Sequence, residues 1–290
     1  IEAGADLRML DLNDNTVLDY AADKNNTEIF RILIDNHPDD DIINKYLSHV
    51  INKKLVNIVQ ILIDKGANID TIYKYDNNKT PLMIAIENKA TEIINLLINN
   101  GANIYSQDNY NNTALMYAVL YGMAETVQSL IEYASKTTSP TSEQSTSLIT
   151  QASKTTSPKS EQSMSLNQYL DKKDYEFKTA LMIAVEKRHE LTDIKKYDQI
   201  IKIIIQKNPM HGKNLFMEYL KDKSLLRDKP EYLLDNGVDI FLPDSEGNTP
   251  LMIAVQNNDG YWVNQLINHV LRKTFPTSNL TSNPTSSPNP

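Results

Sequence analysis

The sequence contains no cysteine among its 290 residues. This absence excludes a disulfide-stapled fold, a cysteine zinc site, an iron–sulfur cluster and a thiol nucleophile. It is also typical of a reducing compartment, which favours the cytoplasm without identifying the location. Only 8 glycines are present, so a glycine-rich phosphate loop is not expected. No apolar run approaches the roughly 18 residues that a membrane-spanning helix requires.

Residues that could carry chemistry are scattered. The five histidines show no pair at the i, i+4 spacing of a metal site. Asp11, Asn13 and Asn15 resemble the start of a calcium loop, but Thr16 and Ala22 stand where that loop needs a glycine and a bidentate glutamate. No serine lies in a nucleophile elbow. We therefore predict no catalytic residue, no cofactor and no metal site, and we expect that the chain is not an enzyme.

Two short motifs recur at a fixed spacing. The first, Thr-Pro-Leu-Met-Ile-Ala and its variants, occupies residues 80–85, 113–118, 179–184 and 249–254, with a weaker copy at 16–21. The second, Gly-Ala-Asn-Ile and its variants, occupies residues 4–7, 66–69, 101–104 and 237–240. From its glycine to the next motif threonine is 12 residues in three cases and 14 in the fourth. Two motifs that recur at a nearly constant distance from each other indicate a tandem repeat.

Each unit reads as two helices followed by an extended turn. Thr80 suits an N-cap and Pro81 the first helical position, where no amide donor is needed. Small Ala85 permits close approach of a second helix, and residues 93–98 predict a helix buried on more than one side. Gly101 follows that helix, where a left-handed residue often ends a helix. The polar residues up to 112 then predict an extended turn, called a finger below.

On these motifs, residues 1–134 and 167–272 resemble ankyrin repeats, a family with a period of about 33 residues and a T-P-L-H-x-A pattern. The resemblance implies an all-α solenoid of helix–turn–helix repeats with extended fingers. It also implies non-catalytic binding of a protein partner. We expect seven units, of which residues 41–70 and 211–240 are degenerate because they lack the threonine motif.

The sequence departs from the family pattern in the fingers and at the helix starts. The turn glycine survives only as Gly247, while Asp14, Asn78 and Asn111 hold that position elsewhere and tolerate φ > 0. Phe177 stands there in another unit, so we expect that finger to be rebuilt. Methionine replaces the family histidine in four units, and we expect it to fill the space without replacing the hydrogen bonds of the histidine: Met83, Met116, Met182 and Met252.

We expect four segments along the chain. Residues 1–134 hold a leading fragment and about four repeats, and residues 166–272 hold about three more. Between them, residues 135–165 are a duplicated Ser/Thr/Pro-rich loop, and residues 273–290 are a similar tail, both predicted to be disordered. We expect the loop to be an insertion in a turn, so that the stack continues across it. Because the chain lacks an initiator methionine, we also expect that it was cut from a longer protein.

The concave groove implied by the resemblance is lined by the fingers and by the first helix of each unit. We expect a monomer that binds a protein partner of unknown identity there, without nucleic acid and without membrane insertion. Aromatic side chains contribute most to such contacts, so Tyr110, Tyr121 and Tyr175 are the preferred anchors. The full set of candidates is Asn77, Lys79, Glu87, Asn109, Tyr110, Asn112, Leu120, Tyr121, Tyr175, Lys178, Glu186, Ser245 and Glu246.

Other functions remain open from the sequence. The chain could be the targeting part of a larger enzyme, or an effector delivered into a host cell, since its Asn/Ile/Lys/Tyr-rich composition resembles AT-rich genomes. Charge offers another alternative, because residues 1–134 carry a net −9 and residues 167–230 a net +4. The basic middle could bind a polyanion, although the overall net charge of −8 argues against wholesale binding of nucleic acid. This unevenness equally fits a solvated surface or a bipolar surface that orients a partner.

Overall fold

The computed structural model describes residues 9–12, 15–36, 40–137, 164–176, 178–190, 194–226 and 230–274. It forms two compact units, residues 1–203 and 204–290, which are treated separately below. Asp14, Phe177, most of the Ser/Thr/Pro-rich segment and most of the tail lie outside the described residues. The expectations about them therefore remain predictions, as do the segment boundaries in general.

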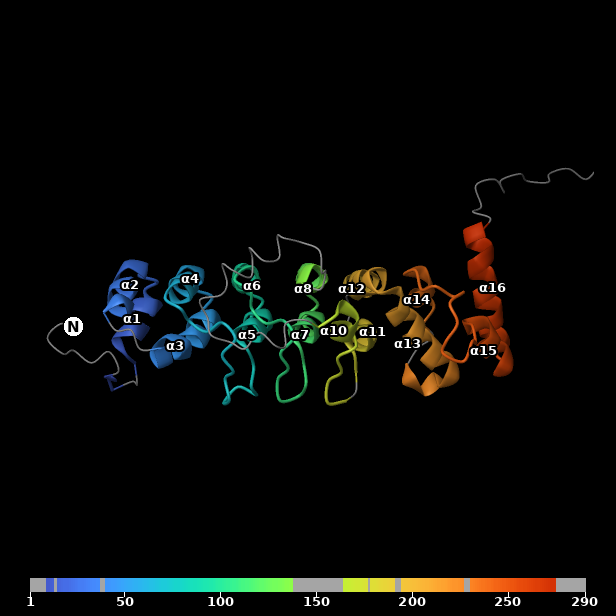
Figure 1. The fold of residues 1–290 in the computed structure, drawn as a ribbon, viewed down its shortest axis with the longest axis horizontal. Coiled ribbons are helices and arrows are strands. Elements are labelled where there is room, and N and C mark those ends of the chain that lie inside the picture. Colours follow the sequence, from blue (N-terminus) through green and yellow to red (C-terminus); the bar gives the residue numbers. More distant parts are fainter. Residues whose placement is uncertain are drawn as a thin grey trace, which may run out of the picture. The chain divides into compact units, whose positions relative to one another are not determined.

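The first unit is a stack of helix pairs (Figure 1). Its inner helices α3, α5, α7 and α11 pack one against the next, and its outer helices α2, α4, α6 and α8 form a second row. The helices run α1 Val17–Asp23, α2 Thr27–Asp35, α3 Asp40–Asn52, α4 Val56–Asp64, α5 Pro81–Glu87, α6 Thr91–Asn99, α7 Ala114–Leu120, α8 Ala124–Thr137, α10 Leu166–Leu170, α11 Ala180–Glu190 and α12 Ile194–Lys207.

The second unit repeats the same principle around an aromatic core. Inner helix α13 packs against inner helix α15, and α15 packs against outer helix α16. Trp262 of α16 is buried, with its ring 5.0 Å from that of Phe216 and 5.7 Å from that of Tyr219. The elements run α13 Pro209–Lys221, the 3₁₀ turn η1 Lys223–Leu225, α14 Glu231–Asp235, α15 Pro250–Gln256 and α16 Gly260–Thr274.

The threonine motif starts the short inner helices as predicted. Thr80 has extended backbone angles, and its hydroxyl accepts a hydrogen bond from the amide of Met83. Pro81 stands at the first helical position, where its missing N–H costs nothing. Thr113 and Thr249 cap α7 and α15 through the same contact. These caps fix where α5, α7 and α15 begin and therefore where the fingers before them end.

Methionine does more at these caps than the sequence predicted. The backbone N–H of Thr80 donates to the sulfur of Met83 at 3.5 Å, and Thr113 donates to Met116 at the same distance. The expectation that methionine leaves the histidine hydrogen bonds unreplaced was therefore wrong. A thioether is a weak acceptor, and here it completes a reciprocal cap with the threonine hydroxyl.

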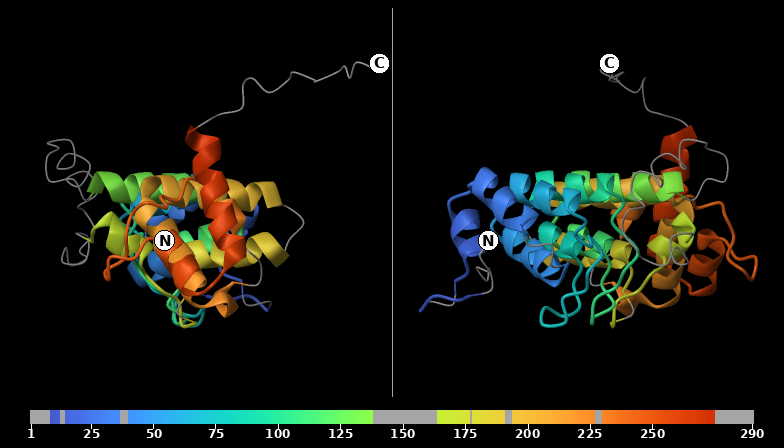
Figure 2. Two further views of the ribbon diagram at one scale, coloured as in Figure 1. Left: turned by 90° about the vertical axis from the view of Figure 1, so that its right-hand side faces the viewer. Right: turned by 60° about the vertical axis from the view of Figure 1, so that its left-hand side comes forward.

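Three consecutive fingers project to the same side of the first unit (Figures 1 and 2). Asn78 and Asn111 adopt φ of 60°, as predicted for the positions that replace the turn glycine. The amide of Asn109 donates to the carbonyl of Asn77 at 2.8 Å, which joins the first two of these fingers. The amide of Tyr175 donates to the carbonyl of Tyr110 at 2.9 Å and joins the third. The fingers thus form a hydrogen-bonded row.

Helix α8 continues to Thr137, and the hydroxyl of Thr137 lies 3.0 Å from that of Tyr105. Helix α16 continues to Thr274. On the far side of the undescribed segment, α10 lies beside α8, and α11 packs against α7. The helix pairs on either side of that segment are therefore neighbours in the stack.

Candidate protein-binding surface

An ion pair joins a finger to the helix that follows it. The ammonium of Lys79 lies 2.6 Å from Oε2 of Glu87 and 3.0 Å from Oδ1 of Asp76. Only 10% of the Lys79 side chain is exposed. Burial lowers the pKa of Lys79, but its hydrogen bonds to Glu87 and Asp76 outweigh that effect and hold the pKa above its ordinary value. Lys79 therefore stays charged and braces the finger against α5.

Two tyrosines of α7 and its C-cap extend this cluster to the next repeat. The ring of Tyr117 stacks against that of Tyr121, with centroids 6.4 Å apart, and Lys79 lies 5.9 Å from the centroid of Tyr117. The hydroxyl of Tyr121 donates to Oε1 of Glu87 at 3.2 Å. Burial and the Glu87 carboxylate raise the pKa of Tyr121. Tyr121 thus contributes to the coupling between repeats, and only part of its ring faces solvent.

The finger–helix pair recurs in the repeat that contains α11. Lys178 lies 2.6 Å from Oε2 of Glu186 and 2.7 Å from Oε2 of Glu176, and these hydrogen bonds raise its pKa. Lys178 is more open than Lys79, with 32% of its side chain exposed. In the intervening repeat the same two positions are Asn112 and Leu120, which cannot form an ion pair. The groove face of that repeat is therefore uncharged at these two positions.

Tyr110 and Tyr175 come together near the tips of neighbouring fingers. Their ring centroids are 5.7 Å apart, and the two residues are 46% and 59% exposed. The finger ladder places them side by side, because Tyr175 donates its amide to the carbonyl of Tyr110. Asn109, also exposed, precedes Tyr110 and pairs with Asn77. The structure thus joins candidates from three fingers into one continuous edge.

The remaining two candidates lie in the finger of the second unit. Ser245 and Glu246 are exposed, and the amide of Glu246 donates to the carboxylate of Asp244 at 2.9 Å. At the finger–helix position, Gln256 donates to the side chain of Asn248 at 3.3 Å, so a neutral hydrogen bond replaces the ion pair. This finger has the same internal turn as those of the first unit.

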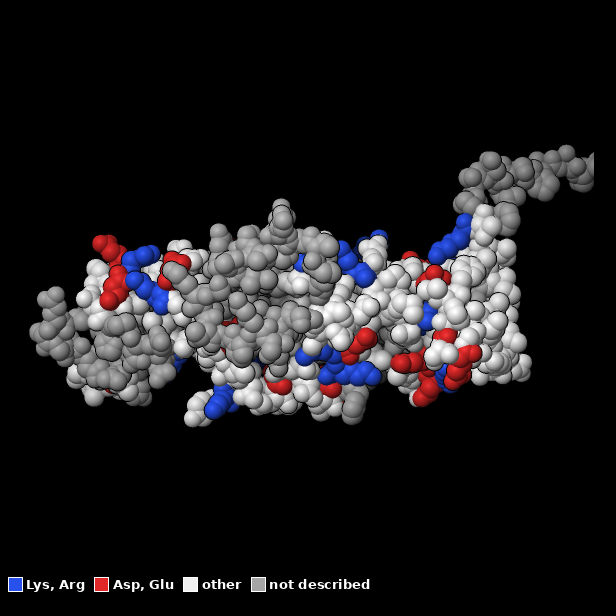
Figure 3. Space-filling view, viewed as in Figure 1, with Lys and Arg blue, Asp and Glu red and all other residues white. Residues whose placement is uncertain are grey.

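Charges of both signs are interspersed on the face drawn in Figure 3, where lysine and arginine lie beside aspartate and glutamate. The ion pairs Lys178–Glu186 and Arg188–Asp198 each hold charges of opposite sign side by side. Interspersed charges weaken any uniform field above the surface. Among the described residues, no cluster of three potential ligands could hold a metal ion. Within the same residues, every helix is too short or too polar to cross a membrane.

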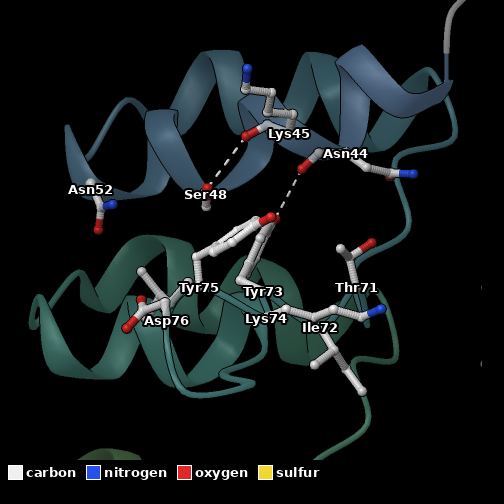
Figure 4. Close-up of a pocket in the computed structure, with 11 residues that line it drawn as sticks. Asn44, Lys45, Ser48, Asn52, Thr71, Ile72, Tyr73, Lys74, Tyr75 and Asp76 are labelled. Carbon is white, nitrogen blue, oxygen red and sulfur yellow. Dashed lines mark hydrogen bonds between the residues drawn. The ribbon is translucent and has the colours of Figure 1, made fainter.

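Sequence reasoning missed a hollow beside α3. It has a volume of about 540 Å³ and lies between α3 and the finger that precedes α5 (Figure 4). Asn44, Ser48 and Asn52 line it from the helix, and Ile72 and Tyr75 from the finger. The unit that contains α3 lacks the threonine motif, so motif positions could not point to it. The only sequence signal was the i, i+4 spacing of three polar residues from Asn44 to Asn52.

Two family models agree with the helix-pair stack. A family model described as "Ankyrin repeats (3 copies)" matches residues 47–141, and a model described as "Ankyrin repeat" matches residues 13–45. Among solved structures, an ankyrin repeat domain from Acinetobacter baumannii AYE is similar, with 17% identity and a TM-score of 0.46. That match covers 87% of this chain and 97% of the other. No curated protein matches significantly.

The fold is thus an all-α stack of helix–turn–helix repeats with projecting fingers, which defines the class of repeat proteins. Within that class, the chain is an ankyrin-repeat protein. Ankyrin repeats are generally protein-interaction modules and typically have no catalytic role. The fold class predicted from the sequence is confirmed.

Proposed function

We propose that this chain is a monomeric, non-catalytic scaffold that binds a protein partner through its fingers and inner helices. The observation that carries the proposal is the exposed pair Tyr110–Tyr175, which two neighbouring fingers hold in ring contact. Tyrosine gives a large contact area at low entropic cost and is enriched among the residues that dominate binding. The finger ladder adds rigidity, which lowers the cost of ordering on binding.

The charges of the groove support recognition by shape and aromatic contact. Lys79 and Lys178 already pair with Glu87 and Glu186, so neither cation is free to attract a polyanion. Asn112 and Leu120 leave a neutral stretch between these pairs. A partner that lies along the fingers would therefore meet alternating polar, apolar and paired positions. Such a pattern favours a protein surface over a phosphate backbone.

The test is a capture experiment with the full chain followed by binding measurements. Partners retained by the immobilised chain are identified by mass spectrometry, and the affinity of each purified partner is measured by calorimetry. The double variant Tyr110→Ala and Tyr175→Ala should bind the partner more weakly, by about 2 kcal/mol or more in binding free energy, as expected for aromatic anchors. Ile32→Ala provides a control, because Ile32 is similarly exposed but lies in the outer helix α2.

Two outcomes would contradict the proposal. In the first, the double tyrosine variant binds the partner as tightly as the parent chain. In the second, binding responds only to reversal of lysines in the basic middle, such as Lys172, Lys173, Lys195 and Lys196, and falls steeply with salt, which would indicate a polyanion instead. Circular dichroism of each variant would show that helicity is unchanged.

A further inference from the structure

The last repeat of the second unit leaves apolar side chains uncovered on one face of its inner helix. Leu251, Met252 and Val255 of α15 are 39%, 51% and 60% exposed. The residues at the same three motif positions of α5 and of α7 are at most 1% exposed. Each of α5 and α7 packs between two inner helices, whereas α15 packs against one inner helix of the described residues, α13. The bare positions of α15 therefore correspond to a missing neighbour.

The first repeat shows which way these three positions face. In α1, Leu18 and Ala22 hold the first and the third of them, and both are fully buried. Asp19 holds the second, and its carboxylate accepts a hydrogen bond from the hydroxyl of Tyr46 in α3 at 2.8 Å. Since α3 belongs to the following repeat, the three positions point toward the repeat that comes next. In α15 the same positions are open to solvent.

The finger that precedes α15 is bare on the same side. Phe241, four residues after Gly237, is 66% exposed. Tyr105, four residues after Gly101, holds the same place before α7 and is 5% exposed. Its ring centroid lies 5.0 Å from that of Tyr169 in α10, edge to face, and α10 precedes the next inner helix, α11. Among the described residues of the second unit, Phe241 has no such cover.

Outer helix α16 extends this bare surface. Ile267 is 43% exposed, whereas Ile98 at the same position of α6 is 6% exposed. Residues 250–271 contain one charged side chain, Asp259, which pairs with Lys223. Terminal repeats of a solenoid normally carry a polar outer face, and a contiguous apolar patch marks a binding site. We call this surface the end face; it consists of Phe241, Leu251, Met252, Val255 and Ile267.

The composition of residues 275–290 does not suit them to cover the end face. They contain two large apolar side chains, Phe275 and Leu280, among serine, threonine, asparagine and proline. The apolar face of a helix needs about three or four such residues in every two turns. The cover of the end face therefore has to come from other residues.

The first unit shows what kind of element covers such a face. Helix α7 packs on α5, and α11 packs on α7, so an apolar helix is the neighbour in both cases. Ala118 and Ala184, the fifth residues of α7 and α11, are fully buried, and their small size permits close approach of the helices. An occupant of the end face thus needs an apolar helix with a small residue near its middle and no charge on its contact side.

We propose that the end face binds an apolar helix of a protein partner. The helix lies against α15 as α11 lies against α7, and continues the packing between repeats that the chain already uses. An aromatic side chain ahead of that helix contacts Phe241, as Tyr169 contacts Tyr105. This inference goes beyond the proposed function, which rests on Tyr110 and Tyr175 of the first unit.

The test selects helical ligands with the full chain. A phage library of helical peptides with randomised contact positions is panned against it, and the affinity of enriched peptides is measured by fluorescence anisotropy. Enriched peptides should be apolar along one face, with a small residue near the middle. The double variant Val255→Lys and Ile267→Lys should bind them at least about tenfold more weakly, because each lysine would lose water in an apolar contact.

The first repeat offers a matched control. Val17 and Ile32 are the same two residue types in an inner and an outer helix, and they are 42% and 52% exposed. The double variant Val17→Lys and Ile32→Lys should change the affinity less than about twofold, because these positions are distant from the end face. Circular dichroism shows that each variant is folded. Binding should also slow hydrogen exchange of the amides in α15 and α16 of the parent chain.

The inference is overturned if no helical peptide is enriched, or if enriched peptides bind the variant at Val255 and Ile267 unchanged. An equal loss in the control variant would place the peptides at the first repeat, and a loss in the variant at Tyr110 and Tyr175 would place them on the fingers. Light scattering tests another occupant. If the parent chain is a dimer and the variant at Val255 and Ile267 is a monomer, a second copy of the chain covers the end face and the inference fails.

Discussion

The ammonium of Lys79 and the carboxylate of Glu87 lie 2.6 Å apart, and this contact joins the base of a finger to the end of the following helix. The same two repeat positions hold Lys178 and Glu186, also 2.6 Å apart. The pairs differ in environment, since 10% of the Lys79 side chain is exposed against 32% for Lys178. The same ion pair thus occurs twice in one chain, once with a shielded lysine and once with a more exposed one.

Double-mutant cycles on the two pairs should give unequal coupling energies. We expect about 1 kcal/mol or more for Lys79→Met with Glu87→Gln, because the Lys79 side chain is shielded from water although Glu87 is partly exposed. For Lys178→Met with Glu186→Gln we expect less than about 0.5 kcal/mol, typical of exposed pairs. Urea denaturation at low and moderate salt measures both. Equal coupling in the two repeats would show that burial does not set the strength of this contact.

The methionine of the motif should matter in proportion to its burial. Met83 is fully buried between repeats, whereas Met252 at the same position of the last repeat is 51% exposed. Met83→Ala should cost about 2–5 kcal/mol, as is usual for truncation in a packed core. Met252→Ala should cost less than about 1 kcal/mol, since little buried surface is lost. Thermal and urea unfolding compare the two, and a similar loss at both positions would contradict the packing described for α5 and α15.

Local rules explain why the repeats were predictable from the sequence. Thr80 and Pro81 act through contacts within one turn of helix, and Asn78 acts through its own φ angle. These features can therefore be predicted without knowing which distant residues pack nearby. The cap made by the Met83 sulfur is also local, but it was missed because methionine is rarely considered as an acceptor. Local signals therefore gave the helix starts and the finger turns.

Contacts between repeats were harder to predict from the sequence. Lys79, Glu87 and Tyr121 were each selected by motif position, yet their mutual pairing depends on side-chain directions across the stack. The recurrence of lysine and glutamate eight positions apart, also in Lys178 and Glu186, was the signal that could have revealed it. The hollow beside α3 was not predictable from motif positions, because the unit that contains α3 lacks the threonine motif.

Asp70 should make stability depend on pH. Burial raises the pKa of Asp70 above its ordinary value of 3.8, although the amide of Asn103 donates to its carboxylate and partly offsets this. The folded chain therefore binds this proton more tightly than the unfolded chain does. Its contribution to stability is full below the unfolded pKa and is lost as the pH rises through the folded pKa.

Asp70→Asn should consequently stabilise the chain at neutral pH. The amide oxygen of asparagine can still accept from Asn103, while the desolvated charge is gone. The advantage over the parent chain should grow as the pH rises from about 3 and should be constant above the folded pKa. Urea unfolding at about pH 3 and about pH 7 measures it. A variant that is less stable at neutral pH would indicate that the carboxylate charge itself is needed.

The undescribed segment between α8 and α10 should be dispensable for stability. Helices α7 and α11 already pack together, and buried Tyr169 of α10 lies with its ring 5.0 Å from that of Tyr105. Replacing residues 138–163 by a Gly/Ser linker of half the length changes the entropy of loop closure by only about 0.6 kcal/mol. The melting temperature should therefore shift by less than about 3 °C.

The matched comparison is Tyr169→Ala, which leaves the segment intact but removes a fully buried ring. It should cost about 3–5 kcal/mol, as large aromatic truncations do. Calorimetry compares the two variants: the linker variant should melt like the parent chain, and Tyr169→Ala should melt well below it. Two melting transitions of the linker variant would show instead that the repeats on either side depend on the residues removed, against the direct packing of α7 on α11.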